Sequence, residues 1–194
     1  MAMTELIDFI KQQGIFRRKS IKKNQHSQLR KLYETGQVMR LSKGLYASTE
    51  FTIDEHFSLI QTVKAVPKGT ICLLSALHFH HLTTQLPFKV WLAVPPNTSI
   101  PKDIPIHYVQ FSGQALETGR EFHILNGVPV PIYNPAKTVA DCFKHRNKIG
   151  LDIALEALKN CWSERRCTMQ ELYEYAEICK VKTVMQPYLE FLAI

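Results

Sequence analysis

The stretch that decides the fold is residues 14–46, GIFRRKSIKKNQHSQLRKLYETGQVMRLSKGLY. Within it, Leu29, Leu32 and Tyr33 recur at helical spacing, which predicts a helix over residues 26–35 with these side chains facing inward. The polar and basic residues between them then face outward. The stretch therefore predicts an amphipathic helix with a narrow apolar side and a cationic side.

The neighbouring segments predict a small domain of three helices and a hairpin. Residues 4–13 have helical spacing and are followed by a glycine, and residues 18–23 predict a second, short helix. Residues 37–41 and 45–47 alternate like strands on either side of a Ser-Lys-Gly turn. Three helices followed by a hairpin is the order of a winged helix-turn-helix, which we assign to residues 1–48.

Positive charge is concentrated at the same end of the chain. Residues 1–46 hold ten Lys or Arg and three acids, a net charge of +7 that equals the charge of all 194 residues, whereas residues 47–194 carry 14 of each sign. A neutral body with one basic end indicates contact with a polyanion at that end. A solvated basic surface is the alternative, and charge alone does not exclude it.

The second helix of a helix-turn-helix enters the major groove and presents its first residues to base edges. Gln can pair with adenine, and Lys or Arg with guanine, whereas basic residues before the helix suit phosphate contacts. The predicted base-reading residues are Gln25, His26, Ser27, Gln28, Arg30 and Lys31. The predicted backbone contacts are Arg17, Arg18, Lys19, Lys22 and Lys23, with Arg40, Ser42 and Lys43 in the wing. A basic three-helix unit that binds a protein is the alternative.

Residues 52–194 predict a mixed α+β domain with a small sheet of about four strands and a helical C-terminal part. Asn126-Gly127 between two alternating runs is a hairpin signal, Asn134-Pro135 marks a helix start, and Thr168 with Glu171 has capping-box spacing. The predicted helices cover residues 52–65, 71–82, 134–145, 150–160, 168–179 and 183–192. The predicted strands cover residues 89–94, 106–111, 121–125 and 128–132.

Four stretches together resemble the AbiEi family of antitoxins, the regulators of type IV toxin–antitoxin operons. They are the region 14–46 with its hairpin QVMRLSKGLYAS, CLLSALHFHHLTTQLPFKVWLAVP at 72–95, YNPAKTVADCFKHRNKIGLDIALEAL at 133–158, and the closing VKTVMQPYLEFL. The second and third stretches are the specific ones, because a winged helix alone is a common module.

The resemblance implies a bacterial antitoxin whose N-terminal domain binds inverted repeats in its own promoter and represses transcription. It implies that the C-terminal domain, residues 52–194, supports neutralisation of a nucleotidyltransferase toxin, typically without a stable complex. Within the third stretch, the candidate antitoxin residues are His145, Arg146, Asn147 and Lys148. The alternative is a basic loop at a helix C-terminus, where cations are favourable.

No enzyme motif accompanies these patterns: the sequence has no P-loop, no GxGxxG, no HExxH and no paired carboxylates of a nucleotidyltransferase. The five scattered cysteines and the histidines lack zinc-ligand spacing, so we expect no metal and no cofactor. No apolar run approaches the roughly 20 residues of a membrane span, and the acidic start is unlike a signal peptide, so we expect a cytoplasmic protein. A DNA-binding antitoxin is favoured over a protein-interaction module that binds its partner through the winged helix, and over an enzyme in which a winged helix is fused to a cryptic nuclease or nucleotidyl-transfer domain.

Overall fold

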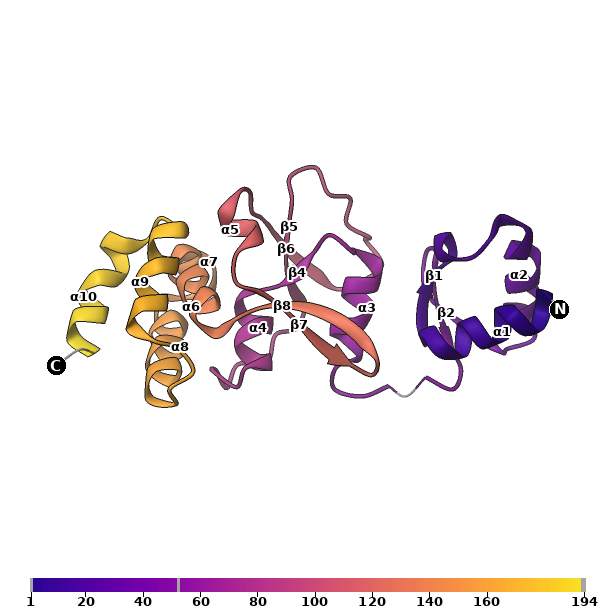
Figure 1. Ribbon diagram of the computed structural model, residues 1–194, viewed down its shortest axis with the longest axis horizontal. Helices are drawn as coiled ribbons and strands as arrows, with labels where there is room; N and C mark the ends of the chain where they lie inside the picture. The colour runs from indigo at the N-terminus through magenta and orange to yellow at the C-terminus, as the bar shows by residue number, and fades with distance from the viewer. Residues whose placement is uncertain (1, 52, 193–194) are drawn as a thin grey trace. The chain divides into compact units, whose positions relative to one another are not determined.

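The computed structural model describes residues 2–51 and 53–192 and divides into two compact units (Figure 1). The first unit contains Met1–Pro67, Ser99–Ile106 and His123–Val130, and the second contains Lys68–Thr98, His107–Phe122 and Pro131–Ile194. The fold is mixed α+β, as the sequence predicts. The domains assigned from sequence, residues 1–48 and 52–194, stay a prediction.

The first unit opens with helices around a three-stranded antiparallel sheet of order β1-β3-β2. The elements are α1 (Ala2–Gln13), β1 (Ile15–Arg17), the 3-10 turns η1 (Arg18–Ser20) and η2 (Lys23–Gln25), α2 (His26–Glu34), β2 (Val38–Ser42), β3 (Leu45–Ser48) and α3 (Phe57–Ala65). The core between α1, α2 and the sheet consists of Leu6, Ile10, Phe16, Ile21, Leu29, Leu32 and Val38. The periodic apolar residues of α1 and α2 therefore supply most of this core.

Two expectations for this region are wrong. The predicted helix over residues 18–23 is replaced by η1 and η2. The chain stays extended as far as Arg18, because β1 pairs with β3 and the Arg18 N–H donates to the Gly44 carbonyl at 2.9 Å. Tyr33 does not face inward. It is 47% exposed, and its ring lies edge-to-face with Tyr46 of β3 at a centroid distance of 6.5 Å.

The predicted capping box at Thr52 involves a residue outside the described ranges, and α3 begins at Phe57. The predicted helix over residues 71–82 is shorter than expected. Thr70–Ile71 forms strand β4, and Cys72 stays extended with its N–H donating to the Trp91 carbonyl at 3.1 Å. The helix that follows, α4, is limited to Leu73–Phe79 because the preceding residues pair in the sheet.

The second sheet has five strands in the order β6-β5-β4-β8-β7, one more strand than the sequence predicts. The strands besides β4 are β5 (Val90–Val94), β6 (Ile106–Gln110), β7 (Arg120–Leu125) and β8 (Val128–Tyr133). β4 pairs antiparallel with β5 and parallel with β8. Every residue of β5 is buried, so this strand lies inside the structure, whereas β6 is an edge strand with exposed side chains.

The C-terminal helices pack around α6, as Figure 1 shows. After the short α5 (Gln114–Glu117), the helices are α6 (Pro135–Lys144), α7 (Arg146–Ile149), α8 (Leu151–Ser163), α9 (Met169–Ile178) and α10 (Lys182–Leu192). The Asn134 side chain caps α6 by accepting from the Lys137 N–H at 2.8 Å, and Thr168 with Glu171 forms the predicted capping box. Among the described residues, no helix combines the length and the apolar character that crossing a membrane requires.

Candidate nucleic-acid interface

α2 presents a polar face to solvent. Leu29 and Leu32 are buried on one side, and the residues on the opposite side, Ser27, Arg30, Lys31 and Glu34, are exposed. One turn of helix separates Arg30 from Glu34, and the Arg30 guanidinium donates to the Glu34 carboxylate at 2.7 Å. Exposed pairs of this kind are weak, so Arg30 remains able to exchange this partner for another acceptor.

The two glutamines expected at this surface are not exposed there. Gln25 is 9% exposed, and its side-chain oxygen accepts from the Lys22 N–H at 3.3 Å, which closes the turn before α2. Gln28 is half-buried, with its side-chain oxygen enclosed and without a hydrogen-bond partner among the described residues. The outward face of α2 is therefore centred on Ser27, Arg30 and Lys31.

A groove runs between α2 and the hairpin of β2 and β3. His26, Ser27, Arg30 and Tyr33 line it from α2, and Arg18, Arg40 and Tyr46 line its other parts. The adjoining hollow is lined by Arg17, Arg18, Lys19, His26, Arg40, Lys43, Gly44 and Tyr46. Tyr46 stacks on the buried Phe16 at 6.0 Å, so the aromatic wall of the groove is fixed to the core. The groove thus combines two tyrosine rings with several cations and one carboxylate, Glu34, which pairs with Arg30.

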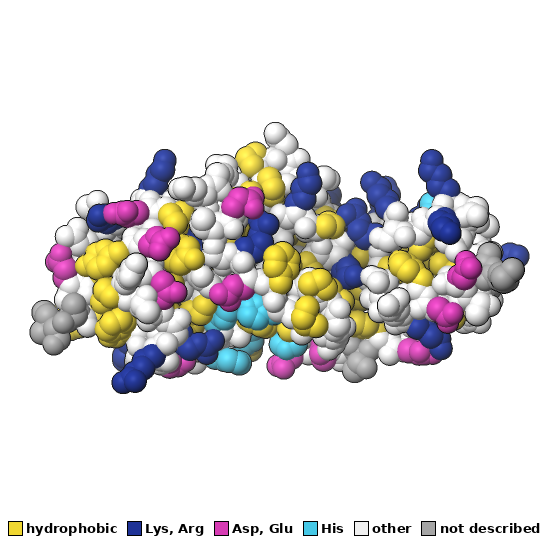
Figure 2. Space-filling view, in the orientation of Figure 1, with side chains coloured by type: hydrophobic (Ala, Val, Ile, Leu, Met, Phe, Trp, Pro, Cys, Tyr) yellow, Lys and Arg dark blue, Asp and Glu magenta, His cyan; other side chains and the backbone are white. Residues whose placement is uncertain are grey.

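Most basic residues expected to contact phosphates are at the surface. Arg18, Lys19, Lys22, Lys23 and Lys43 are exposed and Arg17 is half-buried. Arg40 is exposed, and its Nε donates to the Ser42 carbonyl at 3.3 Å, whereas Ser42 itself is only 7% exposed. Figure 2 shows dark-blue side chains projecting from the part of the first unit that carries α1 and α2. The Ser42 carbonyl therefore orients the Arg40 guanidinium, whereas the buried Ser42 hydroxyl has little access to a ligand.

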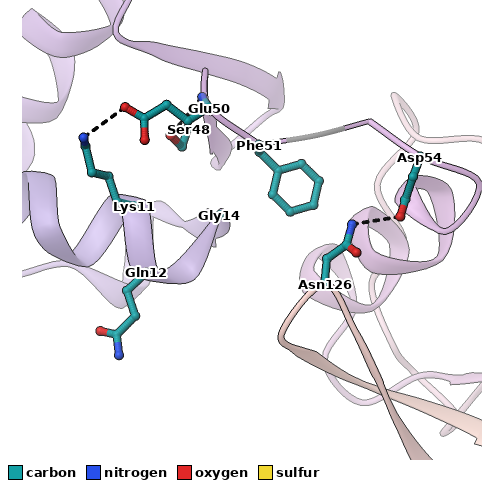
Figure 3. A pocket seen from close by; sticks show the side chains of 8 residues that line it. All are labelled: Lys11, Gln12, Gly14, Ser48, Glu50, Phe51, Asp54 and Asn126. Atoms are coloured by element: carbon teal, nitrogen blue, oxygen red, sulfur yellow. Dashed lines mark hydrogen bonds and ion pairs between the residues drawn. The ribbon is translucent and has the colours of Figure 1, made fainter.

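Another hollow of the first unit lies beside the segment that leaves β3 (Figure 3). Lys11 pairs with Glu50 at 2.9 Å, and the Asn126 amide donates to the Asp54 carboxylate at 3.0 Å. Phe51 packs on Gly14, where an added Cβ would lie 2.5 Å from the ring. The side chains of this hollow bind one another, which indicates a structural role in holding the chain after β3.

The candidate antitoxin residues lie where α6 ends. His145 stacks on Phe111 at a centroid distance of 5.5 Å, and the Arg146 guanidinium donates to the Phe143 carbonyl at 2.9 Å. Asn147 and Lys148 are exposed. Burial lowers the pKa of His145 to about 4, and the neighbouring lysines act in the same direction, so its imidazole is neutral at pH 7. Two of the four side chains are thus bound to the fold, and two are open to a partner.

A buried ion pair lies in α6, and the sequence alone does not reveal it as a pair. The Lys137 ammonium donates to the Asp141 carboxylate at 2.5 Å, and both side chains are 0% exposed. The ammonium also lies over the rings of Tyr133 and Phe111, at 4.2 and 4.9 Å, and Asp141 accepts from the Cys179 thiol at 3.2 Å. Burial raises the pKa of Asp141, and Lys137 opposes that shift. The i,i+4 spacing was the available signal, but it is equally common on helix surfaces.

No group of three or more His, Cys, Asp or Glu side chains that could hold a metal ion occurs within residues 2–51 and 53–192. All five cysteines are buried and unpaired by disulfides. Burial raises the pKa of the Cys72 and Cys142 thiols, which keeps both protonated. The polar surface around α2 is therefore the richest candidate for ligand binding, and its chemistry is that of anion recognition.

These observations place the chain in the class of mixed α+β proteins with a basic surface beside a short helix. No protein-family model and no curated protein matches the sequence. Among solved structures, the chain is similar to the crystal structure of the RV2827C protein from Mycobacterium tuberculosis, with a TM-score of 0.59 and 13% sequence identity. The match covers 84% of this chain and 66% of that one, so this chain spans a little under two thirds of its length. At this identity the similarity concerns the fold alone.

Proposed function

We propose that this chain is a DNA-binding antitoxin of the AbiEi type, with a winged helix-turn-helix in its first unit. In this assignment α2 is the recognition helix, and the β2–β3 hairpin is the wing. The observation that carries the proposal is the exposed face of α2, where Ser27, Arg30 and Lys31 lie beside a groove lined with further cations. These side-chain types suit base edges and phosphates.

The dimensions of α2 support a major-groove contact. A helix with its side chains is about 10–12 Å across, which fits the groove width of about 12 Å, and nine residues give α2 a length of about 13 Å along the groove. Arg18, Lys19, Lys22 and Lys23 precede the helix and suit the phosphates that flank the groove. In this proposal Lys31 and Arg30 read bases, whereas Gln25 holds the turn before the helix.

The antitoxin part of the proposal rests on the sequence resemblance. It assigns neutralisation of a nucleotidyltransferase toxin to the C-terminal part of the chain, with Asn147 and Lys148 as the exposed candidates. Neutralisation proceeds without a stable complex between the two proteins, and the first unit represses the operon through inverted repeats.

A gel-shift titration against the DNA upstream of the protein's own gene tests the DNA-binding claim. A scrambled duplex of the same length is the reference, and both are titrated at several salt concentrations. We expect Lys31→Ala to weaken binding to the operator more than to the scrambled duplex. Lys19→Ala should weaken both alike and reduce the salt slope by about 0.9.

Lys159→Ala is the control, because Lys159 is exposed on α8 in the second unit. It should leave both affinities unchanged. Binding of operator and scrambled duplex with equal affinity, or no binding at low salt, would overturn the repressor claim. Co-purification of the chain with the toxin through the winged helix, with no operator binding, would instead favour a protein-interaction module.

A further inference from the structure

A stacked pair of rings lies at the edge of the five-stranded sheet, on β6. Residues alternate along a strand, so His107, Val109 and Phe111 share one face. Val109 and Phe111 are buried, but His107, at the start of the strand, is exposed. Its imidazole lies parallel to the indole of Trp91 on β5, with ring centroids 3.8 Å apart and an interplanar angle of 20°. Trp91, itself 8% exposed, covers one face of the imidazole, and the exposure of His107 leaves the ring accessible from the side away from Trp91.

Two exposed lysines share this location. Lys89 directly precedes β5 and is two residues from Trp91, and Lys148 belongs to α7, whose start is held against Phe111 by the His145 stack. Burial lowers the pKa of His107, and the positive charges of Lys148 and Lys89 lower it further. The ring is therefore neutral at pH 7 and lies in a locally positive environment.

We propose that His107, Lys89 and Lys148 form a second nucleic-acid site, specific for single-stranded segments, in which a base stacks on the open face of His107 and the lysines bind the flanking phosphates. Stacking on a ring is open to unpaired bases, because the faces of paired bases are covered by their neighbours. The underlying indole fixes the platform at no cost in side-chain entropy on binding. No ion pair of Lys89 or Lys148 occurs among the described residues, so their charge is available to an anion.

This site is independent of the winged helix, because its residues all belong to the second unit. A duplex operator would bind through α2, and a single strand through β6 and α7.

The experiment is a fluorescence-anisotropy titration of the full chain with a labelled 12-nucleotide single strand of mixed sequence. We expect His107→Ala to weaken binding by at least about 5-fold, the lower end for loss of one stacked base. His107→Phe keeps a flat ring on Trp91 and should retain affinity to within about 3-fold. The double variant Lys89→Ala/Lys148→Ala should reduce the salt slope by about 1.4, the value for two phosphates of a single strand.

Lys159→Ala is the matched control and should bind the strand like the parent chain. The same variants are titrated with the duplex operator, whose binding should not change, so failure of this site is distinguishable from failure of the winged helix. The proposal is overturned if the strand does not bind at low salt, if the His107 and lysine variants bind it like the parent, or if Lys19→Ala abolishes the binding. Circular dichroism of each variant verifies that the fold is retained.

Discussion

Removing one partner of the buried Lys137–Asp141 pair should destabilise the protein far more than removing both. At 2.5 Å and an effective dielectric constant of 20, the attraction between the two charges is about 7 kcal/mol, and desolvation of the two ions opposes most of it. Lys137→Met leaves an unpaired buried carboxylate, and Asp141→Leu leaves an unpaired buried ammonium. Each single variant should lose about 3–5 kcal/mol of unfolding free energy at pH 7.

The size of each loss depends on how the remaining group responds. Asp141 already has a raised pKa, so in Lys137→Met the carboxyl can take up a proton, which limits the loss to the lower end of that range. The Lys137 ammonium keeps its two aromatic neighbours in Asp141→Leu, but they do not replace a carboxylate. The double variant replaces both charges by apolar groups and should lie within about 2 kcal/mol of the parent.

Urea denaturation monitored by circular dichroism gives the four free energies of this double-mutant cycle. The exposed pair of Lys182 and Glu177 is the matched control, because its atoms are also 2.5 Å apart while its side chains are 53% and 61% exposed. Lys182→Met should not change the unfolding midpoint measurably. The reasoning is refuted if the single variants at Lys137 and Asp141 cost less than about 1 kcal/mol, or if the double variant loses the sum of the two single losses.

Three further predictions concern single positions. The depressed pKa of His145 contributes stability above pH 6.5 that is lost as the pH falls towards 4, about 1–2 kcal/mol after allowance for solvent screening. His145→Phe should therefore lose less unfolding free energy between pH 7 and pH 4 than the parent chain does. An equal loss in the two proteins would contradict the assignment. Gln25→Ala should lower the free energy of unfolding, measured by urea denaturation, by about 1 kcal/mol, because it leaves the Lys22 N–H unpaired. An unchanged free energy of unfolding would contradict the structural role of Gln25. Gly14→Ala should cost about 1–3 kcal/mol, because φ is +61° and the new Cβ meets Phe51; an unchanged melting temperature would show that the ring moves aside freely.

The parts of the fold that the sequence predicts are those with local signals. Asn134 followed by proline starts α6, and the Thr168 side chain accepts from the Glu171 N–H at 3.2 Å as its spacing predicts. The Asn-Gly turn joins β7 and β8. Each of these signals acts over four residues or fewer, so the chain carries it in any tertiary context.

The short strands were missed because distant residues create them. Ile15 of β1 pairs with Ala47, and Ile71 of β4 pairs with Leu92 on one side and Ile132 on the other. A strand of two or three residues shows no alternation that a sequence window can detect. Both strands therefore become visible only when their partners are in place.

Composition locates the basic end of the chain but does not say which of its side chains are open. Ser42 was expected to contact DNA and is buried: the pairing of β2 with β3 shifts register between Arg40 and Ser42, so Ser42 does not follow the exposed Arg40, while the adjacent Lys43 stays exposed. Tyr33 was expected in the core and stands in the groove instead, beside Tyr46. The sign of the charge on this surface can thus be predicted from the sequence, whereas the exposure of each side chain depends on how the hairpin packs against α2.

Charge counts have a further limit, which explains why the site at the β6 edge could not be predicted from the sequence. Residues 47–194 have no net charge, but several of their acids bind a cation nearby: Asp141 binds Lys137, and Glu177 binds Lys182. Each pair removes one charge of each sign, so the total stays neutral even where an individual lysine lies away from any acid. Lys89 and Lys148 are 59 positions apart in the sequence, and in the proposed site they act together because the fold brings the start of β5 and α7 near His107. A neutral total therefore does not exclude an anion-binding surface, and the salt slope of strand binding measures the uncompensated charge directly.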